Sequence, residues 1–186
     1  MLCGETKQFE LSGEGNSVVT NIDKYKCGEF SNCLMTSGVM ESGKHRISFK
    51  ITRGDVAIEY QEYEVYCGLA RDGAAWNKDH GGAHLTDAWF IGNGGCFWGN
   101  GKEGERWRPS QTKIKDGDIL SVEANLDEGT LRFWKNGKPH GPGWSSGVMG
   151  KVRWAVQIAY CGDSVQIVPT PELQLGYSPA VEKILD

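Results

Sequence analysis

The sequence predicts an all-β fold, a two-sheet antiparallel β-sandwich. Apolar and polar residues alternate over positions 120–126, the two-residue period of a half-buried strand. Two tight-turn sequences, Asp127-Glu128-Gly129 and Asn136-Gly137, flank a second alternating run at 130–134. Because a three-stranded antiparallel meander cannot bury its apolar face alone, we expect a second sheet to cover it.

The other strands follow in chain order from shorter alternating or apolar runs. A first strand begins at Phe9, and a glycine turn at 14–16 leads into a second through Val18 and Val19. Further strands are predicted at 33–40, 46–51, 65–69, 89–91, 152–158 and 165–167. The glycine-rich stretch 92–104 is expected to turn tightly at least twice, and residues 56–63 form either a strand end or a lid.

Length and composition fit one domain. A chain of 186 residues buries roughly 70% of its unfolded surface. Twenty-six glycines and only six prolines suit short strands with many tight turns. We place the domain at residues 1–175 and a tail or linker at 176–186, where Ser178 and Pro179 begin either a short helix or a linker.

Charge and cysteine content set expectations about partners and compartment. The net charge of −4 is spread over scattered lysines and arginines, so we expect no nucleic-acid partner. No apolar run reaches the length of a membrane span, and the N-terminus lacks the apolar core of a signal peptide. We therefore expect a cytoplasmic or nuclear protein whose six cysteines are reduced.

Two residue patterns that could carry chemistry are better explained without it. Glu123, Asn125 and Asp127 share a strand face, but glycoside hydrolysis needs two flanking carboxylates, and a solvated face followed by a turn is the better interpretation. Asp79, His80, His84 and Asp87 offer nitrogen and oxygen donors that could bind a metal. The His80–His84 spacing favours zinc only on a helix, which Gly81-Gly82 disfavours, so a polar loop is the better interpretation. We expect no catalytic residues, no metal and no cofactor.

The ordered motifs resemble those of SPRY domains. The decisive set is Leu126-Asp127, an acidic glycine turn, Leu131-x-Phe133, and Asn136-Gly137 followed by a glycine and an aromatic residue. Four further motifs occur in the matching order: Gly43-Lys44-His45, Tyr66-Cys67-Gly68-Leu69-Ala70, Gly117-Asp118-Ile119-Leu120, and the strand 154–158 with Tyr160-Cys161-Gly162. The resemblance covers residues 18–168, with Phe49 and its neighbours replacing the Trp-Glu pair usual in that family.

This resemblance implies a concanavalin-like jelly roll that acts as a non-catalytic protein-interaction module. In that family a partner peptide usually docks on loops gathered at one end of the sandwich, here 21–32, 71–87 and 160–162. Tyr25, Trp76 and Tyr160 would be apolar anchors, while Lys24, Lys26 and Arg71 would meet acidic or carbonyl groups. The full candidate set is Lys24, Tyr25, Lys26, Arg71, Asp72, Trp76, Asp87, Tyr160, Cys161 and Gly162.

Two other functions stay open on the sequence alone. A carbohydrate-binding or carbohydrate-cleaving jelly roll would stack sugar rings on loop tryptophans such as Trp76. A purely structural domain would bind nothing through its loops. The residues indicate a protein or peptide partner most directly, since irregular aromatic loops on a rigid scaffold commonly carry binding. We expect a monomer.

Overall fold

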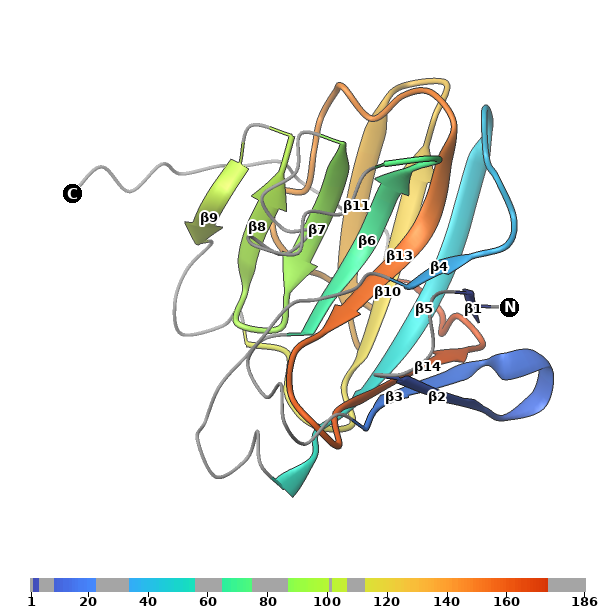
Figure 1. The fold of residues 1–186 in the computed structure, drawn as a ribbon. Coiled ribbons are helices and arrows are strands. Elements are labelled where there is room, and N and C mark those ends of the chain that lie inside the picture. The colour runs from blue at the N-terminus through green and yellow to red at the C-terminus, as the bar shows by residue number, and fades with distance from the viewer. Residues whose placement is uncertain are drawn as a thin grey trace.

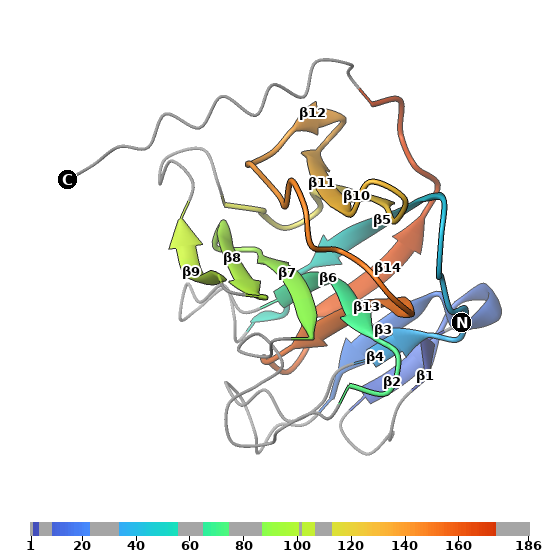
Figure 2. The same ribbon diagram turned by 90° about the horizontal axis from the view of Figure 1, so that it is seen from above.

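The computed structural model describes residues 2–3, 9–22, 34–55, 65–74, 87–100, 102–106 and 113–173. Over these ranges it confirms the all-β prediction. Two seven-stranded antiparallel sheets face each other, with a short 3₁₀ turn, η1 (Glu14–Asn16), near the start of the chain (Figures 1 and 2). No helix within the described ranges is long and apolar enough to span a membrane.

The sheets are named A and B. Sheet A has the order β1 (Leu2–Cys3), β4 (Leu34–Thr36), β13 (Val152–Ile158), β6 (Val65–Arg71), β7 (Ala88–Gly92), β8 (Cys96–Gly99), β9 (Lys102–Arg106). Sheet B has the order β12 (Lys138–Pro139), β11 (Thr130–Lys135), β10 (Ile119–Asn125), β5 (Lys44–Thr52), β14 (Ser164–Val168), β3 (Val18–Asn21), β2 (Phe9–Ser12).

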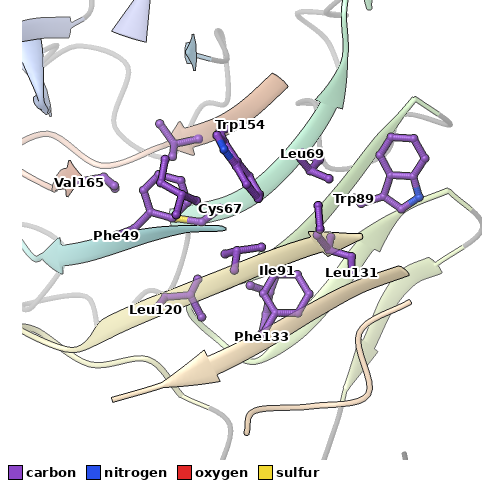
Figure 3. Packing of buried hydrophobic residues seen from close by; sticks show 14 of the residues in the cluster. Phe49, Cys67, Leu69, Trp89, Ile91, Leu120, Leu131, Phe133, Trp154 and Val165 are labelled. Atoms are coloured by element: carbon purple, nitrogen blue, oxygen red, sulfur yellow. The ribbon is translucent and has the colours of Figure 1, made fainter. Parts of the chain in front are cut away.

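The core fills the space between the sheets with one face of each strand. On sheet B, Leu120 and Phe49 are fully buried, and on sheet A the fully buried residues include Leu69 and Trp89 (Figure 3). Each such large apolar side chain contributes about 1.5–3 kcal/mol by leaving water. The alternation read from the sequence therefore corresponds to the inward rows of the two sheets.

Sheet A is also apolar on its outer face, which the period-two pattern does not reveal. Tyr66, Ala70, Ala88, Phe90 and Ala155 form a second buried cluster there. Strand β6 is consequently buried on both faces along Val65–Ala70 and reads as a continuous apolar run. Gly68 is needed within it, because a Cβ at that position would lie 1.9 Å from the Trp89 carbonyl oxygen.

The predicted meander is confirmed. Val122 pairs with Phe133 across β10 and β11, so the two alternating runs place their apolar residues on the same face. Asn136 and Gly137 have φ values of 50° and 78°, the two positive angles that a type I′ turn requires. Trp134 and Trp154 are both buried, as the strand patterns predicted.

The glycine-rich stretch 92–104 contains more structure than the predicted turns. It includes β8 and most of β9, with tight turns before and between the two strands. Phe97 is the large apolar residue that β8 directs into the core, where it contacts Phe133 and Trp144 at ring-centroid distances of 5.7 and 5.5 Å. One inward aromatic residue among glycines gives too short a pattern to predict a strand. The predicted strand 33–40 is likewise shorter, since β4 ends at Thr36.

The cysteine prediction is met by the described residues, while three other predictions fall outside them. Cys67, Cys96 and Cys161 form no disulfide bond, as expected for reduced cysteines. Residues 56–63 and the tail segment 178–186 lie outside the described residues, so the lid and the C-terminal helix stay predictions, as does the domain boundary at 175.

Alanine substitutions at two glycines with the same φ angle test whether the segment around Glu172 packs on the Asn136-Gly137 turn. Gly117 and Gly137 both have a φ of 78°, but a Cβ at Gly117 meets no atom within 4 Å, while one at Gly137 lies 2.7 Å from the Glu172 carbonyl oxygen. We expect Gly117→Ala to lower the free energy of unfolding by about 1 kcal/mol through left-handed strain, and Gly137→Ala by about 2–3 kcal/mol. Equal losses in urea unfolding would show that the segment around Glu172 does not pack on this turn.

Candidate functional site

The described candidate residues fall into two groups at opposite ends of the sandwich. Strands β6 and β13 are antiparallel neighbours, with Arg71 opposite Val152 and Val65 opposite Ile158. In Figure 1, β6 runs upward and β13 downward. The loops that follow these strands therefore leave from opposite ends. Arg71, Asp72 and Asp87 therefore lie at the opposite end of the sandwich from residues 160–162, which corrects the expected grouping for these described residues. Residues 75–86 lie outside the described residues, so the position of the rest of the 71–87 segment stays a prediction.

We name the two ends by their central residues. The Arg71 end comprises residues 36–41, Arg71, Asp72, Asp87 and residues 149–153, which are joined by the contacts described below. The Asp163 end comprises Asn21, Arg53, Gly54 and residues 160–163. Lys24, Tyr25, Lys26 and Trp76 lie outside the described residues, so their proposed contacts stay predictions.

Arg71 joins two loops at its end of the sandwich. Its Nε forms an ion pair with Asp87 Oδ1 at 2.9 Å, and its Nη1 donates to the Met149 carbonyl oxygen at 3.0 Å. The guanidinium lies 5.3 Å from the ring centroid of the buried Trp89. The Arg71 amide also donates to the Asp87 carbonyl. Arg71 thus fixes the start and end of the 71–87 loop against the segment that carries Met149.

Arg153 makes a second clamp one strand away. Its Nε donates to Asp72 Oδ1 at 2.6 Å, and its Nη1 donates to the carbonyls of Thr36 at 3.1 Å and Ser37 at 2.6 Å. Its side chain is only 21% exposed, so these contacts are partly shielded from water. No signal in the sequence identifies Arg153, because an outward arginine on a core strand has no distinguishing local pattern.

Exposed apolar side chains gather at the Arg71 end. Among the described residues, the exposed large hydrophobic side chains are Ile22 (46%), Val39 (39%) and Met149 (57%). Val39 precedes Met40, whose amide and carbonyl both pair with Val152 at 2.9 Å. Met149 has its carbonyl held by Arg71. Val39 therefore lies next to a backbone pair held by hydrogen bonds, and Met149 lies on backbone held by Arg71.

The Asp163 end is held together by a buried carboxyl group. Asp163 is fully buried, and its Oδ1 accepts a hydrogen bond from the Gly54 amide at 2.7 Å. Its carbonyl accepts from the Asn21 amide, and the Gly162 amide donates to the Asn21 carbonyl. A Cβ at Gly54 would lie 2.6 Å from Gly162, so the backbones touch directly. Gly162, predicted as a partner contact, has a packing role that the sequence did not reveal.

Burial changes the acidity of this group. It raises the pKa of Asp163 to about 6 from an ordinary 3.8, and the nearby negative charge of Asp116 adds to the rise. The Gly54 hydrogen bond and the positive charge of Arg53 oppose it. Oδ2 of Asp163 is buried with no hydrogen-bond partner among the described residues, which fits a carboxyl group that is costly to ionise.

The acidic strand face has structural roles. Glu123 is buried, contrary to the expected solvated face, because Arg46 and Lys44 on the neighbouring strand form ion pairs with it. Asn125 Oδ1 accepts from the Glu128 amide at 3.3 Å, and Asp127 Oδ1 accepts from the Gly43 amide at 2.8 Å. These groups are engaged in holding backbone and cations, so this face offers no carboxylate pair for glycoside hydrolysis.

Metal ligands do not cluster in the part of the chain that the structure describes, where no three His, Cys, Asp or Glu side chains gather. Asp87, one of the donors considered with the two histidines, is ion-paired with Arg71. The remaining donors of that group, Asp79, His80 and His84, lie outside the described ranges.

Solved structures identify the architecture. The SPRY domain of human HERC1 superposes with a TM-score of 0.65 and 16% identity, over 88% of this chain and 95% of that one. The fold is that of a SPRY domain. The PSpry domain of TRIM65 gives a TM-score of 0.61 and 13% identity over 88% of this chain and 86% of its own, which confirms the resemblance seen in the sequence motifs.

The same SPRY fold occurs within a much longer protein. Stonustoxin superposes with a TM-score of 0.63 and 19% identity, over 90% of this chain but only 26% of its own length. No family model and no curated protein matches the sequence. At these identities the comparisons show the fold, and the site must be argued from this chain's own residues.

Two arginine-to-lysine changes test the Arg153 clamp. Lysine cannot donate from both an Nε and an Nη, so we expect Arg153→Lys to lower the free energy of unfolding by about 1–2 kcal/mol and to speed amide exchange over residues 36–41. Arg46→Lys keeps a positive charge beside Glu123 at an exposed position, so a loss of about 0.5 kcal/mol or less is expected. Similar losses for both variants, with unchanged exchange at 36–41, would contradict the clamp.

Replacing Asp163 tests the buried carboxyl group through pH. Because the folded-state pKa of Asp163 lies above its ordinary value, the ionised group destabilises the protein above about pH 6, and this cost disappears as pH falls toward 4. Asp163→Asn cannot ionise. Its stability relative to wild type should therefore improve by about 2 kcal/mol between pH 4.5 and 7.5, measured by urea unfolding. A difference between the two proteins that does not vary with pH would contradict the raised pKa.

Proposed function

We propose that this SPRY-fold chain is a non-catalytic interaction module that binds a peptide segment of a partner protein at the Arg71 end. The observation that carries the proposal is the pair of exposed apolar side chains, Val39 and Met149, on a clamped backbone. Fixed backbone lowers the entropy lost on binding, and exposed apolar side chains supply the contact that removes water.

The two arginines hold the backbone of this surface through hydrogen bonds. Arg71 positions the segment that carries Met149, and Arg153 holds the Thr36 and Ser37 carbonyls near Val39. Asp72 and Asp87 complete these clamps as ion-pair partners. Their proposed role is therefore to shape the surface, in place of the direct contact with the peptide that the sequence suggested for Arg71.

Tyr160 and Cys161 are partly buried at the opposite end of the sandwich. A peptide bound at the Arg71 end does not require them. We retain Trp76 as a proposed additional anchor, since it belongs to the loop whose two described ends, Ala74 and Asp87, lie at the Arg71 end. A cytosolic setting remains part of the proposal, because free thiols such as Cys96 persist in a reducing compartment.

Sugar binding is less well supported. The alternative needs exposed aromatic rings for stacking, yet Trp89, Trp134, Trp144 and Trp154 are buried. Trp98 is partly buried and packs edge-on against Tyr66 at a ring-centroid distance of 6.3 Å. Four of the five described tryptophans are therefore buried, and the fifth, Trp98, is half-buried.

Two matched charge substitutions test where a partner docks. Met149→Asp introduces a carboxylate into the proposed surface, whereas Ile22→Asp does so at an exposed apolar residue next to Asn21, at the Asp163 end. In quantitative capture of cytosolic proteins, we expect Met149→Asp to reduce partner recovery at least tenfold and Ile22→Asp to leave it unchanged.

Circular dichroism and thermal unfolding of both variants confirm that each remains folded. Loss of partners with Ile22→Asp alone would move the site to the Asp163 end. Retention of all partners by folded Met149→Asp would remove the Arg71 end from consideration.

A further inference from the structure

We infer that the partner contacts the Arg71 end with large apolar side chains, and that this recognition does not depend on salt. The inference rests on the proposed function and names the chemistry of the partner. It differs from the sequence expectation, in which Lys24, Lys26 and Arg71 meet acidic or carbonyl groups of the peptide.

Three described cations at this end already have anionic partners within the chain. Arg71 pairs with Asp87 at 2.9 Å, Arg153 with Asp72 at 2.6 Å, and Lys151 with Glu41 at 3.2 Å. The three ion pairs together carry no net charge. They therefore produce no positive electrostatic field that would attract an acidic peptide.

An acidic partner would also have to compete with contacts already made. To bind Arg71 through its Nε, a partner carboxylate would displace Asp87, exchanging one partly exposed ion pair for another. Such pairs contribute little at a wet surface, and the exchange would immobilise the incoming side chain without a net gain in charge pairing. For Arg153 the exchange is less favourable still, because its Nη1 already donates to two carbonyl oxygens.

The described residues at this end leave apolar surface exposed to water. Met149 is 57% exposed and Val39 is 39% exposed, so both leave apolar surface in water. They flank the Met40–Val152 backbone pair, on segments that the Lys151–Glu41 ion pair also joins. Methionine adapts its shape to different apolar partners, which suits a surface that receives a leucine, methionine or aromatic side chain. The structure therefore fits a short extended segment with one or two large apolar residues.

Selection from a random peptide library provides the test. Phage-displayed peptides are panned on the whole chain, and the enriched sequences are synthesised and measured by fluorescence anisotropy at about 50 mM and about 500 mM NaCl. We expect enrichment of Leu, Met, Phe and Trp, and a Kd that changes less than about twofold between the two salt concentrations.

Variants at Met149 locate the contact. Met149→Leu conserves volume and apolar character, so the Kd should stay within about twofold, whereas Met149→Glu should raise it at least tenfold. Asp87→Asn provides a charge control, because it removes the carboxylate that pairs with Arg71. The Kd of acidic peptides should rise with salt for this variant and stay independent of salt for the wild type. Circular dichroism of each variant confirms the fold.

The outcomes separate this inference from the proposed function. If no peptide is enriched, or if enriched peptides bind Met149→Glu as well as wild type, docking at the Arg71 end is wrong. If the peptides need Met149 but are acidic, and lose about tenfold or more in affinity at high salt, the docking site stands and the apolar inference is overturned.

Discussion

The antiparallel register of β13 on β6 determines where the candidate residues of this SPRY-fold chain lie. Seven residue pairs, from Val152–Arg71 to Ile158–Val65, set which side chains enter the core and at which end each following loop leaves. Because side chains alternate along a strand, the register sends Leu69 and Trp154 inward and leaves Arg153 on the outer face beside Ala70. A shift of one residue would reverse every one of these placements.

The same register makes one end of the sandwich rigid. It sets Arg71 opposite Val152, whose backbone also pairs with Met40, so three segments meet there. Arg71 and Arg153 then bind carbonyl oxygens of the loops around them. Loops held at their bases by strands and charged hydrogen bonds keep exposed side chains in place, which is what a binding surface requires. The opposite end depends instead on Asp163 and on glycine contacts that leave no room for side chains.

Burial separates the aromatic residues of this chain into two roles. The tryptophans described at the core, Trp89, Trp144 and Trp154, stabilise the sandwich and are withdrawn from any ligand. Among the described residues, the exposed large apolar side chains are instead Ile22, Val39 and Met149, and no sequence pattern distinguishes them from core residues.

The sequence by itself determined the fold class, the meander with its Asn136-Gly137 turn and the order of the SPRY-like motifs, because alternation and turn chemistry are local properties. It also marked Arg71, Asp72 and Asp87 as candidate residues of the 71–87 loop. Only the tertiary structure decided that Tyr160, Cys161 and Gly162 lie at the other end, that Arg153 is a clamp, and that Glu123 is buried. Those outcomes depend on which strands become neighbours, and strand pairing joins residues far apart in the chain that local patterns do not relate.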